Sequence, residues 1–61
     1  MIPVEIINIV GGEFSVLHRG TVSEENFEKF KLVKSGDGVV RMTDLVLKNA
    51  VPEFVEAIEI A

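Results

Sequence analysis

Ser15 and His18 are the residues of this 61-residue chain whose types and spacing come closest to those of an enzyme. A serine hydroxyl becomes a nucleophile when a neighbouring histidine accepts its proton. Residues three apart on a strand point to opposite faces, however, so we do not expect these two side chains to meet. The chain has no cysteine and one histidine, which argues against thiolate and zinc sites. We therefore predict a protein that is not an enzyme and holds no metal or cofactor.

The acidic side chains point to a different kind of function. Ten acidic and six basic residues give a formal charge of −4. Six of the acidic residues form two groups, Glu24, Glu25 and Glu28, and Glu53, Glu56 and Glu59. Such groups can imitate the phosphates of DNA and occupy the basic groove of a nucleic-acid enzyme. The competing explanation is that these residues only keep the surface of the protein soluble.

The basic residues support a second hypothesis, nucleic-acid binding. The largest basic set comprises Lys29, Lys31 and Lys34, with Arg19 and Arg41 possible neighbours. Binding to phosphates needs a clustered basic surface, and single strands also stack on aromatic side chains. This chain is acidic overall and has neither tyrosine nor tryptophan. We therefore place nucleic-acid binding second and a protein partner first.

The first element expected to position these residues is a β-hairpin. Residues 2–10 and 13–21 are rich in β-branched side chains, and the glycine pair 11–12 between them suits the positive φ angles of a two-residue turn. Counting back from that turn fixes the register and places Glu5 opposite His18. The hairpin is thus predicted with a regular register along its whole length.

This register assigns the apolar side chains to two faces. The predicted core face carries Ile7, Ile9, Phe14 and Val16. The other face carries Val4, Ile6 and Leu17 among polar positions, which is too apolar for free exposure and too polar for an interior. Hydrophobic residues make up 48% of the chain, a high share for so small a domain. We therefore predict a homodimer formed through Val4, Ile6 and Leu17.

A helix is predicted to begin after Ser23 and to end at Gly36. Serine suits the N-cap, and the two glutamates that follow meet the positive end of the helix dipole. Val22 and Phe27 have the spacing of a hydrophobic staple. Phe27 and Phe30 belong to the apolar stripe of this helix, and either one becomes a candidate anchor for a partner if it is exposed beside the acidic turn.

The remaining residues suggest one more strand and a last helix. Residues 39–47 alternate as a strand does, although Thr43 and Asp44 could cap a short helix. Pro52 suits the first position of a helix over 52–60, with a short closing strand as the alternative. The predicted fold is α+β, a single domain over 1–61 with a small antiparallel sheet and the order ββαβα. A second hairpin within 28–47 would instead give an all-β, SH3-like barrel.

The order of hairpin, helix and third strand over residues 4–47 is similar to that of the small dimeric uracil-DNA glycosylase inhibitors of Bacillus phages. The similarity rests on His18, Gly20, Ser23 and Phe27. It implies a homodimer in which Phe27 enters the pocket of the enzyme. The spacing from Gly20 to Phe27 is one residue longer here, and the tyrosines of that family have no counterpart, so we assign no family on these residues.

The function predicted from the sequence is therefore binding rather than catalysis. We expect a small acidic interaction module, homodimeric and cytoplasmic, that modulates or inhibits another protein. Its expected contact residues are the six glutamates of the two acidic groups together with Phe27 and Phe30. No apolar run is long enough to cross a membrane.

Overall fold

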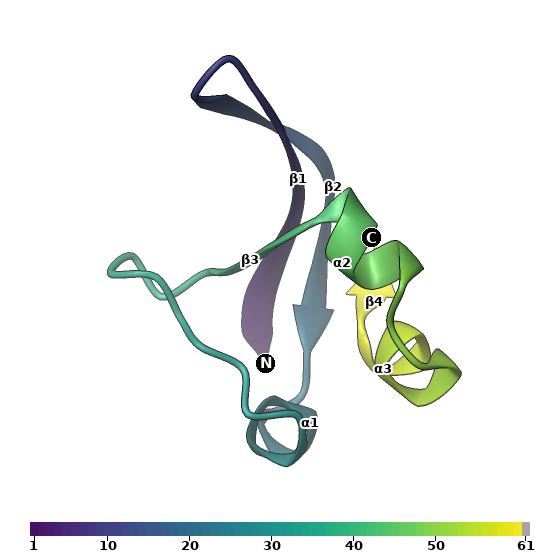
Figure 1. The fold of residues 1–61 in the computed structure, drawn as a ribbon. Helices are drawn as coiled ribbons and strands as arrows, with labels where there is room; N and C mark the ends of the chain where they lie inside the picture. Colours follow the sequence, from purple (N-terminus) through teal and green to yellow (C-terminus); the bar gives the residue numbers. More distant parts are fainter. Residues whose placement is uncertain (61) are drawn as a thin grey trace.

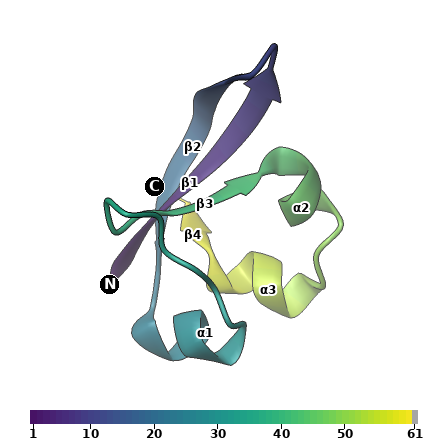
Figure 2. The ribbon, with the colours of Figure 1, turned by 60° about the vertical axis from the view of Figure 1, so that its left-hand side comes forward.

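The computed structural model describes residues 1–60, which form a small four-stranded sheet with three short helices on one side of it (Figures 1 and 2). The elements are β1 (Ile2–Val10), β2 (Glu13–Val22), α1 (Glu24–Lys29), β3 (Val40–Thr43), α2 (Asp44–Lys48), α3 (Pro52–Ala57) and β4 (Glu59–Ile60). The strand order is β3-β1-β2-β4. The α+β class is confirmed, but the sheet is mixed rather than antiparallel because β3 runs parallel to β1.

The hairpin of β1 and β2 turns at the glycine pair, as predicted. Gly11 and Gly12 have φ angles of 59° and 81°, which side chains with a Cβ rarely adopt. The register counted from this turn is correct over its first four pairs, from Val10 opposite Glu13 to Ile7 opposite Val16. The turn residues therefore fix the pairing of the outer half of the hairpin.

A β-bulge changes the register in the inner half of the hairpin. Ile7 lies opposite Val16 but Ile6 lies opposite His18, so Leu17 is an extra residue in β2. Glu5 consequently lies opposite Arg19, and the predicted pairing of Glu5 with His18 is wrong. The bulge has a clear physical benefit, since it moves Arg19 to the side of Glu5 and lets Val22 face the interior.

The core lies on the opposite face of the hairpin from the one predicted. Its buried residues are Ile2, Val4, Ile6, Val22, Val40, Met42 and Ile58. Phe27, Leu32, Leu47 and Phe54 pack against this cluster from the helices and the loop. Of the predicted core face, Ile7 is buried, whereas Ile9 and Phe14 are 57% and 55% exposed. The helices cover only the inner half of the sheet, so the outer part of the hairpin has no helix over it (Figure 2).

Helix α1 begins as predicted but ends about one and a half turns early. The Ser23 hydroxyl accepts a hydrogen bond from the Asn26 N–H at 3.1 Å, so the N-cap is confirmed. Lys31 has a φ of 54°, and the Leu32 N–H donates to the Phe27 carbonyl at 3.0 Å. With the bond from the Lys31 N–H to the Glu28 carbonyl, this is a Schellman motif. It ends the helix because Leu32 then packs against the core beside Phe27.

Replacing Lys31 by glycine is expected to stabilise the fold. A left-handed conformation costs a residue with a Cβ roughly 1–2 kcal/mol, and glycine recovers part of this after its greater entropy in the unfolded chain is counted. We expect the free energy of unfolding to rise by about 0.5 kcal/mol in urea titrations. The control Lys29→Gly, at the last residue of α1, should instead lose up to about 1 kcal/mol. A loss in Lys31→Gly as large as that of the control would contradict this account of the helix end.

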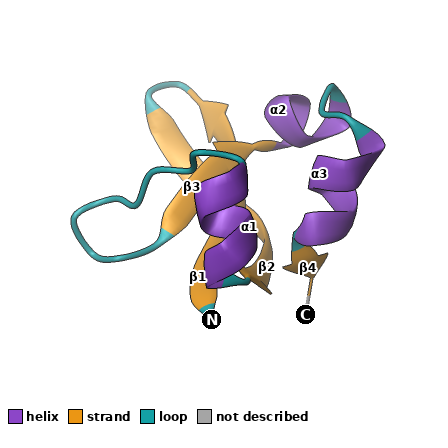
Figure 3. Cartoon of the chain, turned by 90° about the horizontal axis from the view of Figure 1, so that it is seen from below, coloured by secondary structure: helices purple, strands orange, loops and turns teal. Residues whose placement is uncertain are grey.

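In the C-terminal third, the sequence left open strand or helix over 39–47 and helix or strand over 52–60, and in each case the structure contains both. Strand β3 stops at Thr43, whose hydroxyl accepts a hydrogen bond from the Val46 N–H at 3.3 Å and so caps α2. Pro52 starts α3 as predicted, and the two-residue strand β4 follows it and pairs with β2. Residues 24–29 are helical and β3 pairs with β1, so the region 28–47 does not form a second hairpin. Figure 3 shows the long loop that joins α1 to β3.

Candidate interaction surface

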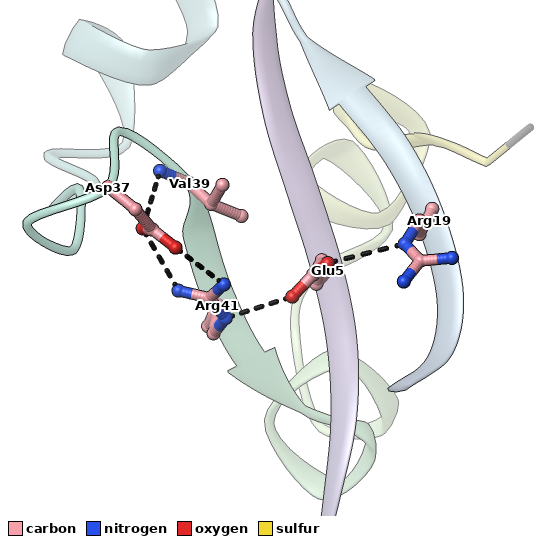
Figure 4. Close-up of polar contacts among 5 residues, drawn as sticks. All are labelled: Glu5, Arg19, Asp37, Val39 and Arg41. Carbon is pink, nitrogen blue, oxygen red and sulfur yellow. Dashed lines mark hydrogen bonds and ion pairs between the residues drawn. The ribbon is translucent and has the colours of Figure 1, made fainter. Parts of the chain in front are cut away.

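The face of the sheet that the helices do not cover carries a row of charged side chains, which comes from β1, β2, β3 and the loop before β3 (Figure 4). The carboxylate of Glu5 accepts hydrogen bonds from Arg41 Nε at 2.9 Å and from Arg19 Nε at 3.3 Å. The guanidinium of Arg41 also donates two bonds to Asp37, at 2.7 and 3.1 Å. This places Glu5 between two arginines that come from the strands on either side of β1.

The contact between Asp37 and Arg41 affects the titration of both groups. The hydrogen bonds from Arg41, and a further one from the Val39 N–H, lower the pKa of Asp37 below its ordinary value of 3.8. In the same way, the hydrogen bond to Asp37 raises the pKa of Arg41. Arg41 therefore stays charged and paired, and its guanidinium is already occupied by two carboxylates of its own chain.

The five basic residues of the nucleic-acid hypothesis do not form one free surface. Arg19 and Arg41 lie on the sheet and share Glu5. Lys29 Nζ lies 3.9 Å from a carboxylate oxygen of Glu53, and Lys34 Nζ lies 5.3 Å from the centre of the Phe27 ring. Only Lys31, at the end of α1, has no such contact among the charged and aromatic contacts of the described residues.

Five of the six glutamates of the two acidic groups lie on helices α1 and α3, and Glu59 lies in β4. Helices α1 and α3 meet through an edge-to-face contact between Phe30 and Phe54, whose ring centres are 5.1 Å apart. All six glutamates are exposed, namely Glu24, Glu25, Glu28, Glu53, Glu56 and Glu59. Phe27 and Phe30 are both half-buried and hold the helices in place. The contact between the two helices thus places the acidic groups on neighbouring elements, and the two phenylalanines have a packing role.

Exposed apolar side chains gather at the outer end of the hairpin and on the helix next to it. We call this set the hairpin surface; it comprises Ile9, Val10, Phe14, Leu17, Leu45 and Val46. Their side chains are 46% to 69% exposed. In Figure 1 the tip of the hairpin extends past all three helices, so no other part of the described chain covers it.

A cavity of about 300 Å³ lies between the hairpin residues and the α2 residues of the hairpin surface. It lies where β3 has ended and β1 continues beside α2, and it is lined by Asn8, Ile9, Thr43, Asp44, Leu45 and Lys48. Across the hairpin, the guanidinium carbon of Arg41 lies 5.6 Å from the centre of the Phe14 ring. Such a cation–π contact at an exposed site stabilises the ring position by roughly 0.5–1 kcal/mol. Phe14 is therefore exposed and also oriented.

The predicted dimer interface is not available as a surface. Val4 and Ile6 are 1% and 0% exposed in the single chain, because α1 to α3 cover the face that was expected to be open. Leu17 is exposed, since the bulge takes it out of the regular alternation. The facing of two valines of β2 shows the effect of the bulge. Val16 faces outward and Val22 faces inward although both are even-numbered, and only an inserted residue between them makes that possible.

The bulge also changes the relation between Ser15 and His18. They lie opposite Asn8 and Ile6, two positions of β1 that share a face, so the argument that separated them was wrong. Within residues 1–60 no hydrogen bond joins the two side chains, and no group of three or more histidine or acidic residues is arranged to hold a metal ion. None of the described helices is long and apolar enough to cross a membrane.

Comparisons with known protein families, with characterised proteins and with solved structures find no match for this chain. The candidate site is therefore defined by its own geometry. It has two parts, the apolar hairpin surface and the exposed glutamates of α1, α3 and β4.

Proposed function

We propose that this chain is a small acidic protein that works by binding and modulating another protein, without catalysing a reaction. The observation that supports this most strongly is the hairpin surface, where four apolar side chains of the hairpin and two of helix α2 are exposed. Monomeric soluble proteins seldom leave an apolar patch of this kind open, and such patches commonly mark sites of protein contact.

The composition of the hairpin surface suits a protein partner. Protein interfaces have an apolar centre with an aromatic anchor and a charged rim. Phe14 is the aromatic side chain of this surface, and the guanidinium of Arg41 lies over its ring. Glu13, Asp44 and Lys48 lie next to the apolar residues in the chain and supply charges at the rim. We therefore take Phe14 as the main anchor of the complex.

The acidic face of α1 and α3 would make a second contact. Five exposed glutamates of α1 and α3, with Glu59 of β4 following, outnumber the exposed lysines Lys29 and Lys31 of the same region, which is therefore acidic. A partner with a basic groove, such as an enzyme that acts on nucleic acid, would be attracted to it and inhibited by its occupation. This extends the main proposal to a partner of defined charge.

The experiment is a comparison of three baits in affinity capture from extract of the native host. The baits are the parent, Phe14→Asp, and the matched control Val33→Asp, which alters an exposed valine away from the hairpin. We expect a protein that the parent and the control retain and that Phe14→Asp loses. Titration calorimetry on that protein should show binding weakened by Phe14→Asp at least about tenfold. Loss of the same protein from both variants, or from neither, would contradict the proposal.

The salt dependence of binding separates the two contacts. Interactions between exposed charges weaken steeply between low salt and about 0.5 M, whereas apolar contacts do not. A partner held by the hairpin surface should keep its affinity over this range. A partner held by the acidic face should lose affinity with salt and also in the double variant Glu53→Gln/Glu56→Gln.

A further inference from the structure

Strand β2 has a free edge over most of its length. One of its sides pairs with β1, while on the other side β4 pairs only with Gly20 and Thr21. Over Glu13–Arg19 no strand of residues 1–60 lies on that second side. Backbone N–H and C=O groups that point outward from such an edge are available for pairing with another strand.

The side chains of this edge are arranged with opposite charge at its two ends. Glu13 stands at the turn end, and His18 and Arg19 stand at the other end. Between them lie Phe14, Val16 and Leu17, with Ser15 as the one polar side chain. Natural edge strands are commonly protected by lysine, proline or a β-bulge, and residues 13–16, before the bulge at Leu17, contain none of these.

We propose that a second copy of this chain pairs with β2 along this edge, antiparallel, so that the two hairpins form one continuous sheet. Antiparallel pairing brings Glu13 of each copy beside His18 of the other copy, twice by symmetry, and the register of the hairpin puts both side chains on one face of the sheet. Parallel pairing would instead place the two glutamates together and the two arginines together. The charges of the edge therefore favour a second copy in the antiparallel sense.

The alternation of side chains selects the register. Residues directly opposite each other in an antiparallel pair share a face, and the bulge at Leu17 limits regular pairing to the outer half of β2. Setting Ser15 opposite Ser15 of the second copy pairs residues 14–16 of each strand regularly and places Glu13 opposite Leu17 at each end. Phe14 then lies opposite Val16 of the second copy, an aromatic and β-branched pair of the kind that stabilises sheets.

The rest of the fold leaves room for this arrangement. In this register, Gly20 and Thr21 of the second copy lie beyond the glycine turn of the first. The short strand β4, which pairs with those two residues, therefore does not obstruct the second copy. The pairing goes beyond the proposed function, because a monomer could bind its partner through the hairpin surface equally well.

A single introduced cysteine tests the register directly, since the natural chain contains none. In the variant Ser15→Cys the two thiols of the paired copies face each other across the two-fold axis, within the range that a disulfide spans. We expect mild oxidation at micromolar concentration to give a covalent dimer about tenfold faster than in the control Ser35→Cys, which alters an exposed loop serine. Equal rates in the two variants would overturn the proposed pairing.

Charge reversal tests the pairing without covalent trapping. Analytical ultracentrifugation over a dilution series would compare the parent with Glu13→Lys, His18→Glu, and the control Glu24→Lys, which makes the same charge change on α1. Each edge variant alone should dissociate at about tenfold higher concentration than the parent, and an equimolar mixture of the two should associate as the parent does. The control should behave as the parent.

The outcomes of this test are distinct from those of the binding experiment. Circular dichroism of each variant shows that loss of association is not loss of folding. A parent that is monomeric at several hundred micromolar, or edge variants that fail to recover when mixed, would overturn the pairing. Neither result would affect capture of another protein by the Phe14 anchor.

Discussion

Replacing Ile6 by alanine is expected to cost about 3 kcal/mol of the free energy of unfolding. Ile6 is fully buried in the central strand β1, between β2 and β3, and belongs to the core cluster. Substitutions of this type usually cost 2–5 kcal/mol, because they remove apolar burial and leave a cavity. A chain of this length has a total stability of roughly 3–9 kcal/mol. Urea unfolding followed by circular dichroism should therefore show a large shift of the midpoint.

Ile9→Ala is the matched control for this prediction. It makes the same chemical change three positions along the same strand, but the side chain of Ile9 is largely exposed. We expect a loss below about 0.5 kcal/mol. The face assignment from the sequence would give the reverse result, with Ile9 in the core and Ile6 on a surface. The ratio of the two losses therefore tests which face of the hairpin the helices cover.

Gly20→Ala is expected to detach β4 from the sheet. A Cβ at this position would overlap the carbonyl oxygen of Glu59 and lie 2.9 Å from its carbonyl carbon and 3.1 Å from the Ile60 Cα. All three are backbone atoms, so no side-chain rotation relieves the overlap. We expect a loss of about 2 kcal/mol or more, because the pairing of β4 is lost and the burial of Ile58 beside it is disturbed.

Gly36→Ala serves as the control for that substitution. A Cβ on Gly36 meets no atom within 4 Å, and the backbone there is not in the left-handed region. Alanine at such a position is neutral or stabilises by up to about 1 kcal/mol, through the entropy of the unfolded chain. If thermal unfolding placed the two variants at the same temperature, the close approach of β4 to β2 would be wrong.

Local signals in the sequence predicted the local features of the fold. The glycine pair set the turn and the first four pairs of the hairpin, because two positive φ angles leave few other residue choices. Ser23 set the start of α1, because its hydroxyl accepts a hydrogen bond from a free N–H of the first turn. Pro52 set the start of α3, because proline has no N–H and the first helical position needs none. The exposure of the six glutamates follows in the same way from the cost of burying charge.

Features that depend on distant residues were not predicted correctly. The bulge at Leu17 brings Arg19 to Glu5, and Glu5 also needs Arg41 from a strand 36 positions further along the chain. Lys31 adopts a left-handed conformation, against the preference of its residue type, because Leu32 gains a place in the core. The hairpin surface was missed for a similar reason, since Ile9 and Phe14 look like core residues until the position of the helices is known.

The sequence by itself determined where the chain turns, where its helices begin and which side chains remain charged at the surface, because those choices depend on a few neighbouring residues. Only the tertiary structure decided which of two apolar faces became the interior. Both faces of the hairpin are apolar enough to be buried, and three short helices can cover one of them. The uncovered side chains at the outer end of the hairpin are the consequence, and the proposed binding function depends on them.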